Sequence, residues 1–258
     1  MVSFPDLTPD PKSNSIDLAF SDGGGVIYEM VDSGDAIFLL ARVTSDADFF
    51  VHKGSHSGGA WSQVGAAITE TPLGMWTDGV VVYLLVNRTD VAGLGCRQLP
   101  AAAGAAEAWQ ECPGFPDYTK VGNNPFSFRG GIFGEGTVMA AWFEVQGLGK
   151  DTIAVHTAID GVWTEVGSTN LPLPTAADFD GDTLYLGFKG DKADSFVYGA
   201  EVGGAFEALP TEGLPATVDT SMDGILGICA LGDTTYLLHG AYNSTPGALY
   251  ELSVYIKK

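Results

Sequence analysis

Short apolar runs alternate with turn-forming residues along nearly the whole chain. β-branched and aromatic residues gather in segments of strand length, and clusters of Gly, Asp and Asn separate these segments at intervals of about 8–12 residues. The longest apolar run, residues 80–86, is far shorter than the ~18 residues that a membrane-spanning helix needs. Residues 101–108 alone have a helix-friendly composition, and Gly104 interrupts them. The pattern predicts an all-β fold.

The chain also repeats itself. An aromatic residue opens the last strand of each repeat unit. These residues are 48, 54 and 43 positions apart, at Trp61, Trp109, Trp163 and Phe206. This period is typical of β-propeller blades, each a four-stranded antiparallel sheet. In every unit a first strand ends at a Gly/Asp turn and an apolar second strand follows. The second strands are predicted at residues 36–43, 80–87, 137–145, 183–188 and 234–240.

Counting these strands leaves one missing. The chain supplies five first, five second and five third strands, the third ones predicted at residues 48–53, 93–99, 152–158, 195–201 and 248–254, but only four fourth strands follow them. Residues 2–7 resemble residues 205–209 and could supply the missing strand. We therefore predict one domain over residues 1–258, a five-bladed β-propeller whose ring is closed by an N-terminal strand. A large sandwich or jelly roll is the alternative fold.

The hairpin between the third and fourth strands carries a resemblance to a known family. Residues 54–61 (GSHSGGAW) and 157–163 (TAIDGVW) resemble degenerate copies of the Asp-box turn of sialidase-type propellers. The overall plan is similar to five-bladed propellers such as the tachylectin-type lectins and the furanosidases. The resemblance implies a propeller fold and a lectin-like character. It transfers no activity, because the Asp-box is a structural turn.

The charge of the chain narrows its partners. Thirty-two acidic residues oppose 12 basic ones, so the net charge is −20. Such a field repels nucleic-acid phosphates and anionic membranes, so neither is an expected partner. Solubility explains the charge most simply, and attraction of cations or of a basic partner is the alternative. The N-terminal residues show no basic segment followed by an apolar one, so no signal peptide is visible.

Three cysteines bear on the compartment. Cys96 and Cys112 are expected on the third and fourth strands of the second unit, nearly opposite each other. A cross-strand disulfide and two packed thiols are both compatible with that placement. Cys229 stands apart. A cysteine pair slightly favours an extracellular or periplasmic location.

First strands line the central channel of a propeller, so their side chains are the candidate binding site. Four residues stand out there: Glu29, Trp76, Arg129 and Asp178. Trp76 could stack on a sugar ring or belong to the core between blades. Arg129 could bind an acidic ligand or pair with Asp178 or Glu29.

No cofactor is expected. Residues 178–182 (DFDGD) resemble the start of a calcium loop, but the glycine comes too early and a hairpin turn explains the Asp-Gly pair. His52 and His56 have zinc-ligand spacing without a third ligand nearby in the sequence.

These observations favour a non-catalytic binding module for carbohydrate or a protein surface, acting through the loop face at the central channel. One alternative is a glycan-acting hydrolase, in which Glu29 and Asp178 would serve as the acid and base. A structural component of a larger assembly is a second alternative.

Overall fold

The computed structural model describes only part of the chain, and every regular element in that part is a β-strand, as the sequence predicts. The described residues are 25–43, 48–58, 60–88, 93–115, 118–119, 130–135, 138–145, 152–159, 162–169, 174–180, 183–188, 197–201, 205–209, 224–231, 234–241 and 251–257.

Strands that follow each other in sequence pair with each other, and the described strands form five antiparallel sheets. Sheet 1 consists of β1 (Gly25–Asp32), β2 (Ile37–Val43), β3 (Phe49–Gly54) and β4 (Ser62–Ile68). Sheet 2 consists of β5 (Thr71–Thr77), β6 (Val81–Arg88), β7 (Gly93–Pro100) and β8 (Gln110–Glu111), and β9 (Tyr118–Thr119) also pairs with β7.

The remaining three sheets repeat this order. Sheet 3 consists of β10 (Gly130–Glu135), β11 (Val138–Val145), β12 (Thr152–Ile159) and β13 (Val162–Thr169). Sheet 4 consists of β14 (Ala176–Asp180), β15 (Thr183–Gly187), β16 (Val197–Glu201) and β17 (Glu207–Ala208). The described strands of sheet 5 are β18 (Gly224–Leu231), β19 (Thr234–Ala241) and β20 (Glu251–Lys257).

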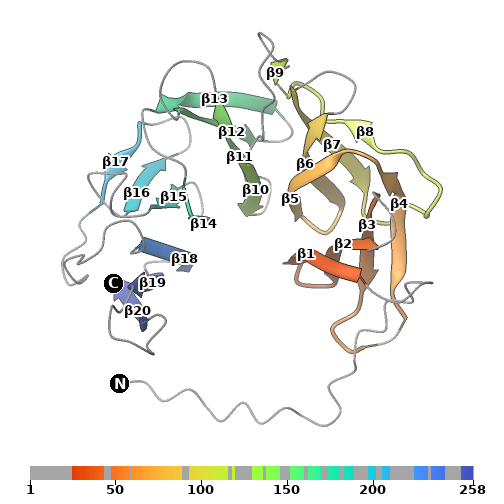
Figure 1. The fold of residues 1–258 in the computed structure, drawn as a ribbon, viewed down its shortest axis with the longest axis horizontal. Helices are drawn as coiled ribbons and strands as arrows, with labels where there is room; N and C mark the ends of the chain where they lie inside the picture. The colour runs from red at the N-terminus through yellow and green to blue at the C-terminus, as the bar shows by residue number, and fades with distance from the viewer. Residues whose placement is uncertain are drawn as a thin grey trace.

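The five sheets stand in an arc around a common centre (Figure 1), with sheets 1 and 5 at its two ends. The first strand of each sheet lies innermost, and these strands touch in succession, β1 with β5, β5 with β10, β10 with β14 and β14 with β18. This is the radial arrangement of β-propeller blades.

In sheets 1 and 2, a Ser-Gly and an Asp-Gly turn connect the first two strands. In the β5–β6 turn Gly79 has a φ of +85°, which glycine adopts without strain. The Asp78 carboxylate accepts hydrogen bonds from the backbone N–H of Val80 at 2.8 Å and of Val81 at 2.7 Å. Gly34 has a similar φ of +84° in the β1–β2 turn. The turn chemistry read from the sequence is confirmed at both places.

The core lies between neighbouring sheets. Alternate residues of β6 face opposite ways, as the period of two in a strand requires. Val82, Leu84 and Val86 pack with sheet 1 residues such as Phe38 and Val51. On the other side of β6, a second cluster joins Leu85 and Trp76 to Ile132 and Trp163 of sheet 3. Both faces of β6 are therefore buried, which explains why its sequence is a continuous apolar run.

Two of the aromatic residues used to align the repeat, Trp109 and Trp163, pack between neighbouring sheets. The indole N–H of Trp109 donates to the carbonyl oxygen of Ala66 in β4, at 2.9 Å. Trp163 packs edge-on against Phe115 of the neighbouring sheet, with ring centroids 5.0 Å apart. Trp61 lies against Gly54 of its own sheet, where a Cβ would come 2.6 Å from the ring.

The predicted strands agree closely with the observed ones in sheets 1 to 3, where most ends differ by a residue or less. The last third strand is displaced, because β20 covers Glu251–Lys257 and the sequence placed it at residues 248–254. Residues 2–7 lie outside the described part of the chain.

A close approach between two first strands makes one glycine critical. A Cβ at Gly74 of β5 would lie 2.9 Å from the backbone nitrogen of Ile132 and 3.2 Å from the Cα of Gly131, both in β10. Backbone atoms cannot rotate away, so the two sheets would have to separate.

We expect Gly74→Ala to lower the free energy of unfolding by roughly 1–3 kcal/mol through this overpacking. Urea denaturation followed by tryptophan fluorescence measures the change. Gly104→Ala is the matched control, because a Cβ there would meet only the Glu107 carboxylate oxygen, at 3.8 Å. Equal stability of the two variants would contradict the close approach.

Candidate functional site

Glu29 lies in the seam between β1 and β5. A bulge between Ile27 and Glu29 shifts the register of β1 against β2. The Glu29 carboxylate accepts a hydrogen bond from the backbone N–H of Met75, at 2.5 Å. Burial raises the pKa of Glu29 to about 7, and the Met75 N–H opposes part of that rise. Near neutral pH this carboxyl group is therefore divided between its acid and its base form.

Trp76 is next to Met75 in the chain, but its ring is turned into the core. The side chain is 8% exposed. It stacks on Tyr83 of β6 with ring centroids 5.6 Å apart and planes inclined by 24°. A ring held in this way presents little surface to a sugar, and the observed contacts are those of core between sheets.

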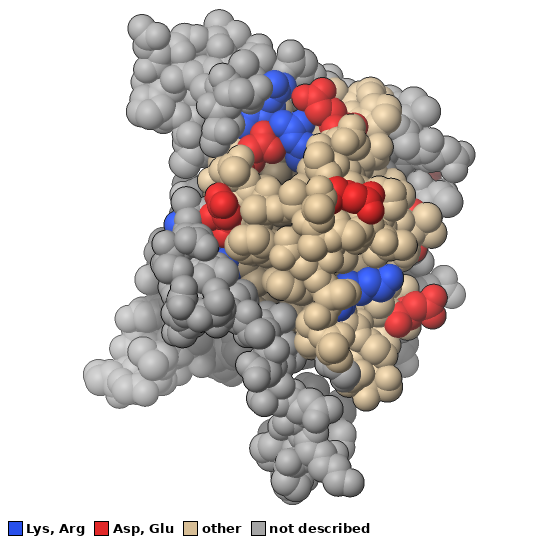
Figure 2. Space-filling view, turned by 90° about the vertical axis from the view of Figure 1, so that its right-hand side faces the viewer, with Lys and Arg blue, Asp and Glu red and all other residues tan. Residues whose placement is uncertain are grey.

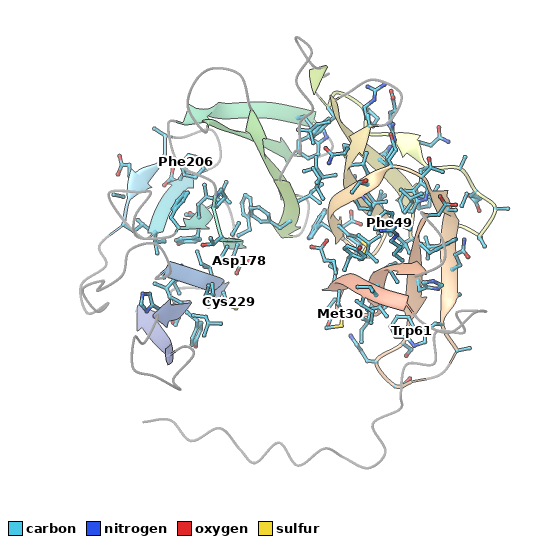
Figure 3. All side chains as sticks on the ribbon, in the orientation of Figure 1. Met30, Phe49, Trp61, Asp178, Phe206 and Cys229 are labelled. Carbon is cyan, nitrogen blue, oxygen red and sulfur yellow. A yellow bond between two sulfur atoms is a disulfide. The ribbon has the colours of Figure 1, made fainter. Side chains whose placement is uncertain are left out.

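Of the other two predicted site residues, the structure describes only Asp178. Asp178 lies on β14, on the opposite side of the arc from β1 (Figure 3), and its side chain is half-buried. Arg129 falls outside the described residues. The structure thus brings Glu29 beside the strand that carries Trp76, whereas Asp178 lies on another sheet, across the arc.

Exposed apolar side chains mark the two end sheets. On β1, Tyr28 is 53% and Met30 65% exposed, and Val26 and Ile27 are about half exposed. On β18, Leu226 and Cys229 are exposed. Figure 3 shows Met30 and Cys229 at the two ends of the arc. We name the exposed apolar residues of β1 the β1 surface (Val26, Ile27, Tyr28 and Met30).

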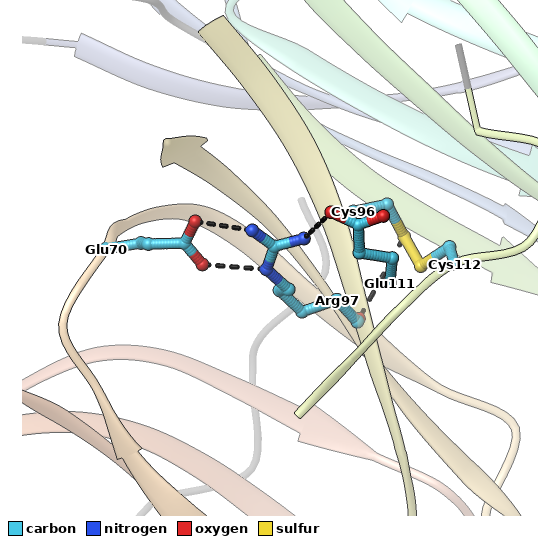
Figure 4. The surroundings of a disulfide bond; sticks show 5 residues. All are labelled: Glu70, Cys96, Arg97, Glu111 and Cys112. Atoms are coloured by element: carbon cyan, nitrogen blue, oxygen red, sulfur yellow. Dashed lines mark hydrogen bonds and ion pairs between the residues drawn. A yellow bond between two sulfur atoms is a disulfide. The ribbon is translucent and has the colours of Figure 1, made fainter. Parts of the chain in front are cut away.

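Sequence reasoning missed a charged cluster in sheet 2 (Figure 4). Arg97 donates two hydrogen bonds to Glu70, from Nε at 2.8 Å and from Nη2 at 2.6 Å. A third bond runs from Nη1 to Glu111 at 3.2 Å. The hydrogen bonds and charge of Glu70 raise the pKa of Arg97 above its usual value. Glu70 lies in the connection between β4 and β5. It is 27 residues from Arg97 in the sequence, so no local sequence pattern predicts the pair.

The two cysteines that the sequence left as either a disulfide or packed thiols form a disulfide. Cys96 of β7 is bonded to Cys112, and their Cα atoms are 5.3 Å apart. The third cysteine, Cys229, is a free and exposed thiol. The Cys112 backbone N–H also donates to the Cys96 carbonyl oxygen at 3.0 Å, so the bridge continues the pairing begun by β8.

Charged side chains are sparse on the flank formed by sheets 1 and 2. Figure 2 shows that uncharged residues cover most of that face and that acidic and basic side chains lie together in small groups.

Within the described ranges, no three His, Cys, Asp or Glu side chains are grouped as metal ligands would be. The described residues contain no helix with the length and apolar character of a membrane span.

Comparison with known proteins gives the fold but no family. No family model and no curated protein matches the sequence. Among solved structures, a chain of a nidogen/laminin complex superposes with a TM-score of 0.52 and 14% identity, over 85% of this chain and 76% of that one. A prolyl endopeptidase also gives 0.52, with 12% identity, and this chain spans 33% of its length. TolB from Acinetobacter baumannii gives 0.47 at 11% identity, with 90% and 54% of the two chains covered.

The fold is of the β-propeller type. At these identities the likeness concerns the fold alone, and the propeller is not thereby assigned to the sialidase or Asp-box type.

The raised pKa of Glu29 predicts a pH-dependent stability. Because the folded state holds the proton up to about pH 7 and the unfolded state loses it near 4.5, stability from this group is complete below pH 4.5 and is lost as the pH rises through 7. Glu29→Gln keeps an acceptor for the Met75 N–H and cannot ionise. We expect the difference in unfolding free energy between variant and wild type to grow in favour of the variant between pH 5 and 8, by on the order of 3 kcal/mol.

Urea denaturation of both proteins across that pH range measures this difference. The subtraction removes the contributions of the other acidic groups. A difference that stays constant with pH would show that Glu29 has an ordinary pKa.

The disulfide predicts a measurable loss of stability on reduction. It closes a loop with a sequence separation of 16 residues, for which chain entropy gives about 3 kcal/mol. We expect the double variant Cys96→Ser/Cys112→Ser to unfold at a lower urea concentration than wild type, while Cys229→Ser unfolds at nearly the same concentration. Native wild-type protein should react with one equivalent of a thiol reagent. Reaction with three would contradict the bridge.

Proposed function

We propose that the chain is a five-bladed propeller forming one domain over residues 1–258, with its ring closed by residues 2–7, and that it serves as a non-catalytic recognition module. The five described sheets support the blade count. Sheet 5 has three described strands where each of the others has at least four, which supports an added strand from elsewhere in the chain.

The observation that carries the recognition role is the β1 surface. Its side chains lie on an innermost strand at one end of the described arc, and there they are exposed although they are apolar. In a chain of net charge −20, apolar side chains gathered on one strand are candidates for a contact surface. Tyr28 combines an exposed ring with a hydroxyl group, as residues at recognition surfaces often do.

The ligand class that fits is carbohydrate or a protein surface. An aromatic ring and a methionine can cover the apolar face of a sugar or an apolar side chain of a protein. A similar structure comes from a nidogen/laminin complex, so this fold can serve within a protein–protein complex. We assign Glu29 to the border of this site, with Trp76 in a supporting role, and Arg129 and Asp178 to the ring beyond it. No cofactor takes part in the proposal. The Cys96–Cys112 bridge supports an extracellular or periplasmic location.

A charge placed on the β1 surface tests the proposal. Wild type, Met30→Glu and Val80→Glu are applied to a glycan array and to a panel of purified proteins. Val80 is the matched control because it is an apolar residue, 71% exposed, in the β5–β6 turn. We expect a ligand retained by wild type and Val80→Glu and bound about tenfold more weakly by Met30→Glu. Retention of nothing, or equal binding by the three proteins, would contradict the proposal.

A glycan-acting hydrolase is the second candidate, and the pKa of Glu29 favours it. A carboxyl group with a pKa of about 7 suits a general acid. A partner carboxylate should stand about 5–10 Å away. Asp178, on β14 across the arc from β1, is the candidate for that role. Turnover of chromogenic glycosides by wild type, lost in Glu29→Gln, would replace the binding role with this one. A structural role in a larger assembly would give neither a small ligand nor turnover.

A further inference from the structure

Sheet 2 contains a pocket of about 310 Å³ that has no part in the proposed β1 surface. That volume is at the lower end of the range for small-molecule sites. The pocket lies along β7 and against the segment that follows β8. Its lining residues are Arg88, Leu94, Gly95, Cys96, Arg97, Glu111, Cys112 and Phe115.

Two of the four arginines of the chain line this one pocket. The side chain of Arg88, the last residue of β6, lies directly against Gly95 of β7. A Cβ at Gly95 would come 3.1 Å from both Cγ and Cδ of Arg88. A glycine at this position therefore lets the stem of Arg88, which lines the pocket, lie against the strand.

Arg97 is held by one carboxylate firmly and by another weakly. Glu70 takes two bonds in a side-by-side geometry and is 15% exposed. Glu111 takes a single 3.2 Å bond from Nη1 and is 74% exposed. A guanidinium has five N–H donors, so Arg97 retains donors beyond those that Glu70 uses. Glu111 can leave at little cost, because an exposed ion pair contributes little stability.

The remaining wall is apolar and is fixed in place. Leu94 is buried in β7, and Phe115 lies against Trp163 of sheet 3. The disulfide holds the segment of Phe115 to β7, and the Phe115 N–H donates to the Cys112 carbonyl oxygen at 3.2 Å. The pocket thus combines two guanidinium groups with an aromatic ring on a rigid base.

We infer that this pocket binds the carboxylate of a small organic acid, held between Arg88 and Arg97 after Glu111 swings away, with the body of the ligand against Phe115. Arginine suits this role because its planar fork matches a carboxylate. The ligand replaces one negative charge at Arg97 with another, so the charge of the pocket is unchanged by the exchange. Binding goes beyond the proposed function and requires nothing of the β1 surface.

Two matched pairs of probes separate the possible sources of the carboxylate. Glucuronate and glucose represent an acidic sugar and its neutral form, and N-acetylphenylalanine and its amide represent a free chain end and its blocked form. Isothermal titration at low ionic strength, where charge contacts are least screened, measures each affinity. We expect at least one acid to bind about tenfold or more tightly than its neutral match.

Variants then locate the binding. Arg88→Gln should weaken the acid about tenfold or more, and Gly95→Ala should weaken it by displacing Arg88. Glu111→Gln should strengthen it, because the competing carboxylate is gone. Arg42→Gln in β2 is the matched control and should leave the affinity unchanged.

Three results would overturn the inference: neither acid binds, an acid and its neutral match bind equally, or Arg88→Gln binds as wild type does. Met30→Glu should not affect these titrations, since Met30 does not line the pocket. Failure here and failure of the proposed recognition surface are therefore distinguishable.

Discussion

Strand β6 of sheet 2 is enclosed between sheets 1 and 3. The rest of the arc depends on the same kind of contact, in which neighbouring sheets pack face to face. One set of the β6 side chains packs with sheet 1 and the alternate set with sheet 3. β2 is also buried, with Phe38, Leu39, Leu40 and Ala41 all at most 2% exposed. A sheet that buries both faces cannot stand alone, because each face needs a neighbour to exclude water. Radial repetition of sheets meets this requirement.

Packing of this kind leaves little room for polar groups in the seams. Glu29 is an exception, because its carboxyl group lies between β1 and β5 with the Met75 N–H as its bonding partner. Desolvation favours the neutral acid there, whereas the N–H favours the carboxylate. Thr175 provides a less costly polar contact between sheets 4 and 5, where its hydroxyl donates to the Ile225 carbonyl oxygen. A neutral hydroxyl needs no charge to be buried, so it carries no such conflict.

Basic side chains are few in this acidic chain, and the arginines described in the structure make specific contacts. Arg97 is buried with Glu70 in a geometry that satisfies both partners, which a lysine could not reproduce with a single ammonium group. Arg42 lies over the ring of Phe49, at 5.5 Å from its centroid. The arginines described in the structure therefore lie in defined contacts, and two of them line the pocket beside the disulfide.

Local pattern determined the strands, because side-chain alternation and Asp-Gly turns act over a few residues. The repeat length indicated the kind of fold. The apolar runs at residues 36–43 and 80–87 indicated strands that need two buried faces, which radially repeated sheets provide. Tertiary structure decided the rest. That Trp76 packs with Ile132 and Trp163 of sheet 3, that Asp178 lies across the arc from β1, and that Arg97 meets Glu70 all depend on how sheets are rotated and brought together. The spacing of residues in the sequence does not reveal these contacts, because they join segments that meet only when the sheets pack against one another.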